Sequence, residues 1–249
     1  MRTARPMTTA LGAMSAALLL VAGCSSSSAS KASDAPRPTT SPPSAGQRLF
    51  ADTFDDDHNL WTLPENENGR TEMVGGDLVW EAKQAADLRP HLLAAPIAEA
   101  FDRGELRMRD VVVRASFTTV RGAGAMGVFC REVRDTDSDF QWFEFVARDG
   151  YAAIRRADAA GHLDVLATTT KVDLPLGQRA TMEAVCADTA DGKTRLWLSL
   201  DGAAVLAATS DEQLGNGGAG LQGYDSPERA RSARFLVRWH DFAVYRPTT

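Results

Sequence analysis

The sequence of 249 residues is poor in residues and blocks that several classes of protein require. It has three cysteines and four histidines, and the histidines are scattered without the spacing of metal ligands. Acidic residues outnumber lysine and arginine by 33 to 27, and the basic residues form no dense block. A protein that binds nucleic acid needs a basic stripe to displace the counterions of the phosphates. We therefore expect no zinc site and no nucleic-acid partner.

Long apolar runs are equally scarce, and residues 10–22 form the one that stands out. At thirteen residues this run is shorter than the roughly 20 that a helix needs to span a bilayer. Arg2 and Arg5 precede it, and Leu20-Val21-Ala22-Gly23-Cys24 closes it. A short basic region followed by such a run is typical of a secretory signal.

This N-terminus resembles the precursor of a bacterial lipoprotein, whose lipobox ends in two small residues and a cysteine. The resemblance implies that residues 1–23 are a signal peptide and that Cys24 is lipidated on its sulfur and its new amino group. The alternative is an ordinary secretory signal in which Cys24 is incidental. Because the remaining chain has no polybasic patch, the lipid would be the anchor. We expect a lipid-anchored protein on the extracytoplasmic face of the cell membrane, with the bilayer as its partner.

The two other cysteines would then form a pair in an oxidising compartment. In alternating strands Cys130 shares a face with Val128, and Cys186 shares a face with Ala184. Both cysteines would point to the apolar side of their strands. This pattern predicts a disulfide between Cys130 and Cys186, which would stabilise the fold by about 3–4 kcal/mol through closure of a long loop.

The composition divides the chain into three parts. Residues 24–46 contain no apolar side chain larger than alanine apart from proline and Cys24. Such a segment cannot bury a core, so we expect a disordered tether with a random-coil span of about 25 Å. We expect residues 47–247 to form one folded domain.

The pattern of turns and strands in that domain predicts an all-β fold. Asp-Gly pairs at 149–150, 191–192 and 201–202 are strong hairpin signals. The runs between turns alternate with period two, as in Val111, Val113, Ala115 and Phe117, or in Leu196, Leu198 and Leu200. Period-two alternation is typical of strands that are half buried.

A series of landmarks follows one order along the chain: L-F-A-D-T-F at 49–54, G-V-F-C-R at 127–131, F-Q-W-F-E-F at 140–145 and R-W-H-D-F-A-V at 238–244. This order resembles the concanavalin A-like lectin/glucanase family, in its laminin-G-like form. The resemblance implies a jelly-roll sandwich of two antiparallel β-sheets in which the first and last strands pair. It also implies a concave face that holds ligand in those members that bind one.

Glucanases of this family carry a strand motif E-x-D-x-x-E, whose carboxylates act as nucleophile and general acid. Two carboxyl groups about 5–5.5 Å apart retain the sugar configuration, and groups about 6.5–9.5 Å apart invert it. Residues 47–247 contain no such motif, and Glu144 is the nearest carboxylate on a predicted strand. We therefore expect a domain without catalytic residues. A divergent glycoside hydrolase that uses Glu144 is the less favoured alternative.

Aromatic and charged side chains on the polar sides of the predicted strands could form a ligand site. Indole faces stack on sugar rings, and charged groups orient hydroxyls or anions. The alternative is ordinary packing under loops and pairing between strands. The candidate ligand-binding residues are Arg114, Arg131, Trp142, Glu144, Arg195 and Trp197.

Asp52 and Asp241 are candidate metal ligands, because members of the resembling family often hold a structural calcium ion near the joined terminal strands. The sequence indicates no other cofactor. His240, next to Asp241, could form a structural pair with it.

Three functions agree with the sequence. The first is a membrane-anchored, non-catalytic lectin-like domain that binds a glycan or a cell-wall component. The second is a structural lipoprotein that docks to an envelope protein, and the third is the divergent hydrolase.

Overall fold

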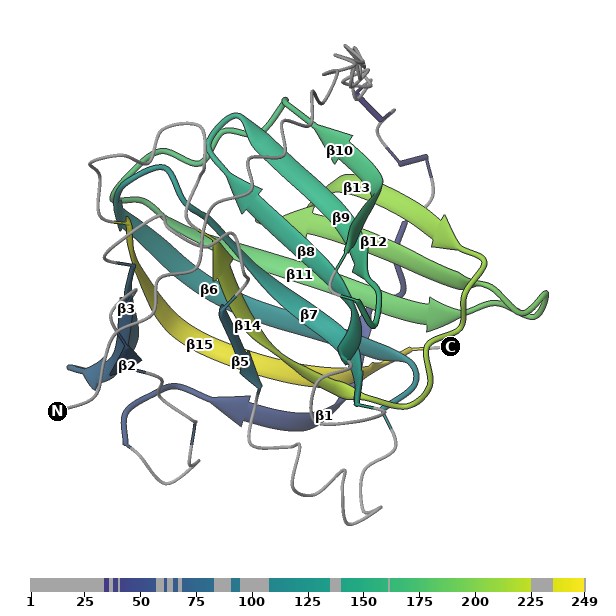
Figure 1. The fold of residues 1–249 in the computed structure, drawn as a ribbon, viewed down its shortest axis with the longest axis horizontal. Helices are drawn as coiled ribbons and strands as arrows, with labels where there is room; N and C mark the ends of the chain where they lie inside the picture. The colour runs from purple at the N-terminus through teal and green to yellow at the C-terminus, as the bar shows by residue number, and fades with distance from the viewer. Residues whose placement is uncertain are drawn as a thin grey trace, which may run out of the picture. The chain divides into compact units, whose positions relative to one another are not determined.

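The computed structural model of the protein describes residues 34–35, 38–39, 41–56, 61, 65–66, 69–82, 91–94, 108–134, 140–160, 162–224 and 235–248. All regular structure in these residues is β-strand, which confirms the all-β prediction (Figure 1). The strands are β1 (Ala45–Asp52), β2 (Glu65–Asn66), β3 (Gly69–Val74), β4 (Asp77–Ala82), β5 (His91–Ala94), β6 (Val111–Arg121), β7 (Ala125–Arg134), β8 (Phe140–Arg148), β9 (Tyr151–Ala157), β10 (Leu163–Thr169), β11 (Arg179–Asp188), β12 (Thr194–Leu200), β13 (Ala203–Ser210), β14 (Gly218–Tyr224) and β15 (Phe235–Pro247).

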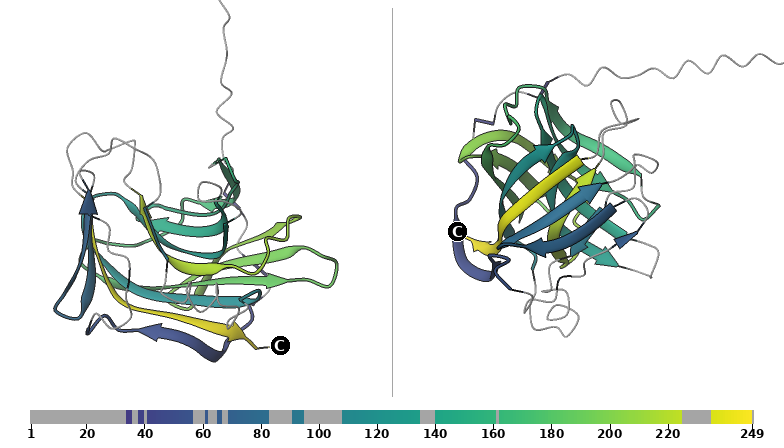
Figure 2. Two further views of the ribbon diagram at one scale, coloured as in Figure 1. Left: turned by 60° about the horizontal axis from the view of Figure 1, so that its bottom comes forward. Right: turned by 90° about the vertical axis from the view of Figure 1, so that its left-hand side faces the viewer.

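The strands form two sheets, which confirms the predicted sandwich. One is nine-stranded, in the order β13-β12-β11-β6-β15-β4-β3-β2, with β1 paired to β15 beside this path. The other is six-stranded, in the order β10-β9-β8-β7-β14-β5. Figure 2 shows one sheet stacked on the other. All paired strands are antiparallel, and the predicted pairing of the first and last strands places Asp52 opposite Phe242.

The core lies between the two sheets and follows the predicted alternation. Val113 and Phe117 of β6 are buried, and so are Leu196 and Leu198 of β12 and Phe143 of β8, all within one hydrophobic cluster. Burying each of these side chains contributes about 1.5–3 kcal/mol relative to leaving it in water. Side chains between them in sequence therefore point to the two outer faces of the sandwich.

The three Asp-Gly pairs form the predicted hairpins. They connect β8 to β9, β11 to β12 and β12 to β13. In the last turn both Asp201 and Gly202 have positive φ, 49° and 76°. This backbone matches the right-handed twist of the flanking strands, which explains why Asp-Gly stands here.

The predicted disulfide is confirmed. Cys130 of β7 and Cys186 of β11 are bonded, with their Cα atoms 6.7 Å apart. Because β7 belongs to the six-stranded sheet and β11 to the nine-stranded one, the bond links the two halves of the sandwich.

The N-terminal side of the domain reaches further back than expected. Strand β1 begins at Ala45, before the expected boundary at 47. Asp34 and Ala35, within the expected tether, hydrogen-bond to Thr170 and Thr168 at the end of β10. Residues 1–23 and Cys24 lie outside the described residues. Among the residues described, no helix has the length and apolar character to cross a membrane.

Candidate functional site

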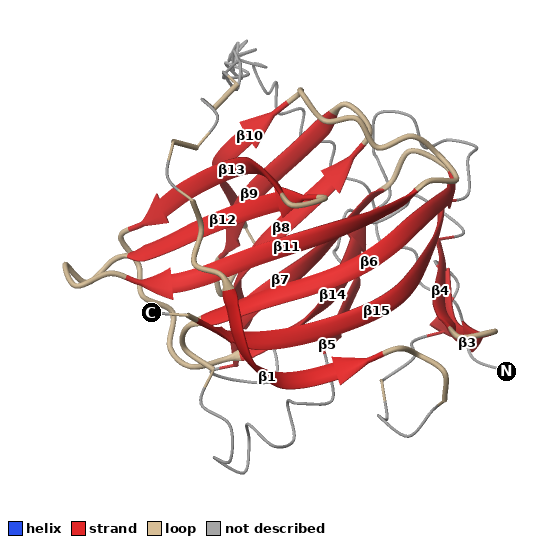
Figure 3. Cartoon of the chain, turned by 180° about the vertical axis from the view of Figure 1, so that it is seen from behind, coloured by secondary structure: helices blue, strands red, loops and turns tan. Residues whose placement is uncertain are grey.

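A pocket of about 550 Å³ opens where the chain before β1 passes the β11–β12 hairpin. Figure 3 shows this chain crossing the outer face of the nine-stranded sheet before it enters β1. Trp197 and Arg195 of β12 line the pocket together with Thr189 and Asp191 of the hairpin and Pro43 of the preceding segment. The volume is within the range of about 300–1,000 Å³ typical of small-ligand sites.

The alternation of β12 directs Trp197 and Arg195 to this pocket. Because Leu196 and Leu198 occupy the core, the residues between and beside them must lie on the outer face. Trp197 stands between Val185 and Ala207 on the neighbouring strands and packs in a small cluster separate from the main core. The predicted orientation of this Trp-Arg pair is therefore confirmed.

Trp197 is 6% exposed and forms an apolar wall of the pocket. Its indole Nε1–H is buried without a hydrogen-bond partner among the described residues. An unsatisfied buried donor of this kind costs about 1–3 kcal/mol. The ring thus contributes mainly apolar surface to the pocket, and its own N–H is buried without a hydrogen bond to the described residues.

Charged groups of the hairpin stand beside the indole. Thr189 donates its hydroxyl hydrogen bond to Asp191, which lowers the pKa of that carboxyl, and the cations Lys193 and Arg195 add to the effect. Thr189 also holds the turn closed, since its backbone N–H donates to the carbonyl oxygen of Lys193 at 2.9 Å. Arg195 is exposed. An ionised carboxylate and a guanidinium therefore flank one apolar wall.

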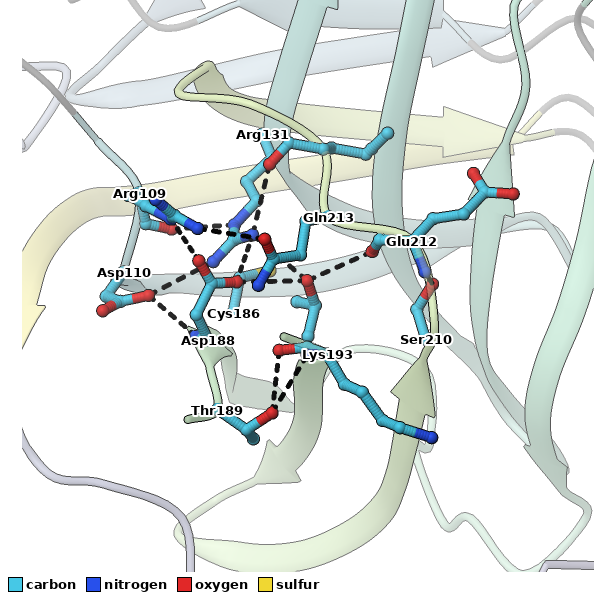
Figure 4. A network of polar contacts seen from close by, with 12 residues as sticks. Arg109, Asp110, Arg131, Cys186, Asp188, Thr189, Lys193, Ser210, Glu212 and Gln213 are labelled. Carbon is cyan, nitrogen blue, oxygen red and sulfur yellow. Dashed lines mark hydrogen bonds and ion pairs between the residues drawn. The ribbon is translucent and has the colours of Figure 1, made fainter. Parts of the chain in front are cut away.

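Below the pocket, a polar network ties the hairpin to both sheets (Figure 4). The Arg131 guanidinium donates to Asp188 Oδ1 at 2.7 Å, to Asp110 Oδ1 at 3.2 Å and to the Thr194 hydroxyl at 3.1 Å. Burial works against ionisation of Asp188, but hydrogen bonds from Arg131 and Arg109 outweigh it and lower its pKa. The network therefore holds Asp188, which lines the pocket, against both sheets.

Arg131 corrects one prediction. Simple alternation placed it on an outer face as a ligand-binding residue, but its side chain is fully buried between the sheets. The register of β7 shifts between Cys130 and Val133, and Arg131 has a positive φ of 54°. A bulge of this kind re-aims a side chain. Arg131 therefore binds the protein itself.

Trp142 and Glu144 lie together, as predicted, but on the opposite side of the sandwich from Trp197. They share the outer face of the six-stranded sheet, and Trp142 Nε1 donates to Glu144 Oε2 at 3.2 Å. Glu144 is fully buried and forms an ion pair with Arg155 of β9. The candidate residues therefore do not converge on one site.

Arg114 lies on the outer face of the nine-stranded sheet but does not line the pocket. Its Nε donates to Glu183 Oε2 at 3.0 Å, and its guanidinium lies 5.4 Å from the centre of the Tyr245 ring. The hydrogen bond that Arg114 donates to Glu183 raises the pKa of Arg114. This is the cross-strand pairing that was the alternative to a ligand site.

The candidate calcium ligands are not brought together. Asp52 faces the core side and accepts hydrogen bonds from Trp61 Nε1 at 2.6 Å and from the Phe54 N–H at 2.7 Å. Asp52 pairs with Phe242 across β1 and β15. Asp241 directly precedes Phe242, so its side chain points to the other face, where its Oδ2 accepts a hydrogen bond from Arg179 Nη2 at 2.7 Å. No group of three or more metal-ligating side chains occurs in the described part of the chain.

His240 pairs with Asp77 of β4 rather than with Asp241. Its Nδ1 lies 2.6 Å from Asp77 Oδ1, and its Nε2 lies 2.8 Å from the Thr118 hydroxyl. The order acid, imidazole and hydroxyl matches that of a hydrolytic triad. However, Thr118 stands within the central strand β6, paired on both sides, so its strand amides are used by the sheet and none forms an oxyanion hole.

Comparison with known proteins supports the fold alone. No protein-family model matches the sequence, and no curated protein matches it either. A protein of unknown function with a galectin-like fold from Bacillus subtilis is 14% identical, with a TM-score of 0.58 over 82% of this chain and 98% of the other. The potassium-bound carbohydrate recognition domain of Emp46p is 10% identical, with a TM-score of 0.51 over 80% and 96%.

A third similar structure is SCLam, a non-specific endo-beta-1,3(4)-glucanase of family GH16. It is 14% identical, with a TM-score of 0.52 over 85% of this chain and 96% of the other. The domain is therefore a concanavalin A-like sandwich.

The sequence identified Trp197 and Arg195 but missed their neighbours in the pocket. Asp191 was recognised only as part of a turn, although a turn directly before a strand lies next to the outer-face residues of that strand. No feature of the sequence indicated Pro43 as a pocket residue, because it lies in a segment without alternating apolar residues.

Proposed function

We propose that the protein is an extracytoplasmic lipoprotein, anchored through acylated Cys24, whose sandwich binds a glycan without cleaving it. The binding site is the pocket beside Trp197. The observation that carries this proposal is the convergence of Trp197, Arg195 and Asp191 on one pocket of about 550 Å³.

This combination suits a sugar. The C–H faces of a sugar ring pack on apolar walls such as Trp197 and Pro43, while its hydroxyls bind planar charged groups. Asp191 and Arg195 supply an acceptor and donors next to that wall. The occurrence of a carbohydrate recognition domain among proteins of the same fold supports the choice of ligand class.

Binding without cleavage is supported by the state of Glu144. A glycosidase needs one carboxyl group to donate a proton and a second to act as nucleophile or base. Glu144 already accepts a hydrogen bond from Trp142 and pairs with Arg155. With these contacts, Glu144 links β8 to β9 within the six-stranded sheet.

The test is a glycan and cell-wall array with the full-length protein, with and without calcium. We expect binding to one glycan class, and we expect Arg195→Ala to weaken it at least tenfold without a change in melting temperature. Arg48→Ala removes another exposed arginine, on β1, and is the matched control. Equal binding by Arg195→Ala and the wild type would reject the pocket, and binding of no glycan would reject the function.

The lipid anchor is tested separately. Mass spectrometry of the mature N-terminal peptide should show a diacylglyceryl modification on Cys24. Cys24→Ser should release the protein from the membrane fraction. An unmodified Cys24 on mature protein would reject the anchor and leave the glycan proposal standing.

A further inference from the structure

Asp34 fastens the chain before β1 to the end of β10. Its Oδ1 accepts the backbone N–H of Thr170 at 2.9 Å and the Thr170 hydroxyl at 3.1 Å. Lys171 Nζ lies 3.9 Å from its other oxygen. The Thr170 N–H, with smaller effects from the hydroxyl and from Lys171, lowers the pKa of Asp34. The carboxylate is therefore ionised and bonded at neutral pH.

Ala35 continues this attachment. Its N–H donates to the carbonyl oxygen of Thr168 at 2.8 Å, and its side chain packs against the main core. Strand β10 is an edge of the six-stranded sheet, and an edge presents unpaired backbone groups that proteins tend to cover. Residues 34 and 35 cover the last part of this edge.

The same segment reaches the Trp197 pocket eight residues later. Pro43 lines that pocket, and Ala45 packs beside Trp197 and pairs with Pro247. Eight residues can span at most about 28 Å, and a strand of the length of β10 spans about 23 Å. This reach is enough for the segment to connect the end of β10 with the pocket.

The two points lie at opposite ends of the sandwich. At the first, which we term the β10 end, the Gly150 N–H donates to Val172 at 2.9 Å and the Gly177 N–H donates to Thr119 at 2.8 Å. At the second, the hairpin end, Asp188 is bonded to Arg131 next to the start of β6. The Trp197 pocket belongs to the hairpin end.

We infer that the attachment of Asp34 and Ala35 makes the β10 end the membrane-proximal end of the domain and holds the Trp197 pocket at the distal end. We term the described residues 34–35, 38–39 and 41–44 the strap. This inference rests on the proposed anchoring through Cys24. With the strap attached, the ten residues 24–33 separate the anchor from Asp34. Ten residues reach at most about 35 Å and have a coil span of about 16–19 Å.

Detachment of the strap would reverse this orientation. The connection from the anchor to Ala45 would then be twenty-one residues, 24–44, for which a random coil spans about 25 Å. It would join the domain at the hairpin end, beside the pocket. The bonds of Asp34 thus decide whether the pocket faces the bilayer or the space beyond it.

The surface of the β10 end suits a position near lipid. Leu176 is 58% exposed and Val120 is 43% exposed, and the ammonium group of Lys171 stands in the same region. Exposed apolar side chains next to a cation favour contact with a bilayer surface.

Hydrogen exchange of the full-length protein in detergent tests the strap itself. We expect the amides of Ala35 and Thr170 to exchange at least tenfold more slowly than in a free peptide. Asp34→Ala should abolish this protection at Thr170. Asp173→Ala removes an exposed carboxylate from the same loop and should leave it unchanged. Exchange at free-peptide rates in the wild type would overturn the strap, whether or not Cys24 carries lipid.

Fluorescence quenching tests the orientation in vesicles that hold the acylated protein and a headgroup-linked quencher. Leu176→Cys labels the β10 end, and Asp191→Cys labels the hairpin end. Because Cys130 and Cys186 are bonded, the new thiol is the one available to a dye. We expect stronger quenching at position 176 than at 191, and we expect Asp34→Ala to remove or reverse the difference. Equal quenching at the two positions in the protein that keeps Asp34 would overturn the orientation. Failure of the protein to stay on the vesicles would instead reject the anchor.

Discussion

Arg131 and Asp188 form an ion pair across the two sheets, with Nη1 and Oδ1 2.7 Å apart, directly beside the disulfide between Cys130 and Cys186. A covalent link and an ionic link thus join β7 to β11 at the same place. The guanidinium is fully buried and the Asp188 side chain is 13% exposed. The hairpin that carries the pocket is built directly on this junction.

Removal of the buried guanidinium should be costly. Arg131→Ala removes the buried cation from Asp188 and Asp110 and leaves Asp188 with the exposed Arg109 alone. Breaking a buried pair from one side costs about 3–5 kcal/mol. Urea denaturation should show this loss of unfolding free energy. Arg114→Ala, which breaks a pair with a half-exposed arginine, should cost about 1 kcal/mol or less. Similar losses of unfolding free energy in the two variants would contradict the role of the Arg131 network as the main support of the hairpin.

Removal of the disulfide should have an effect of comparable size. The double substitution Cys130→Ala and Cys186→Ala releases a loop of 56 residues in the unfolded chain, and the entropy model gives a loss of about 3–4 kcal/mol. Urea denaturation with and without reductant checks this. Reductant should destabilise the wild type and leave the double variant unchanged, so an effect on both would point to another cause.

Acid should weaken the fold through Asp77 as well as Asp188. Burial opposes ionisation of Asp77, but hydrogen bonds from His240 and Arg238 outweigh it and lower its pKa. A carboxyl whose pKa is lower in the folded state stabilises the protein above its unfolded pKa of about 3.9, and this contribution is lost as the pH falls through the folded value.

The unfolding free energy should therefore decrease from about pH 5 to about pH 2. Asp77→Asn should be less stable than the wild type at the upper pH and should show a flatter decline. A decline of the same slope in Asp77→Asn would show that other carboxyl groups account for it.

Trp197 is predicted to serve stability as well as binding. Because it is 6% exposed, Trp197→Ala should cost about 3–5 kcal/mol. Trp197→Phe keeps an aromatic wall and removes the unpartnered N–H, so it should cost much less. Thermal unfolding of both variants, followed by the glycan assay, separates the two roles. Loss of binding in Trp197→Phe at unchanged stability would show that the ligand requires the whole indole ring.

Predictions from local patterns and predictions from long-range position had different outcomes. Alternation correctly placed Leu196 in the core and Trp197 on the outer face, because the side chains of a strand must point to opposite sides. It failed at Arg131, where a bulge changes the side to which the residue points. A bulge depends on the partner strand, and the sequence of β7 alone contains no sign of it.

Side-chain pairs between distant strands could not be predicted from the sequence, for the same reason. His240 was expected beside Asp241, yet it binds Asp77, and Asp52 and Asp241 face opposite sides of their sheet. Which side chains meet depends on the register between strands far apart in the chain. A shift of one residue moves every side chain to the other face.

The sequence by itself determined the all-β character, the hairpins at the Asp-Gly pairs and the disulfide pairing, because periodicity, turn geometry and an even number of remaining cysteines are local or countable properties. The tertiary structure alone decided that Arg131 is internal, that the candidate ligand residues are divided between two faces, and that Asp34 binds Thr170. Those outcomes depend on register, on a bulge and on a segment without any pattern. Each is settled only when strands distant in sequence are brought together.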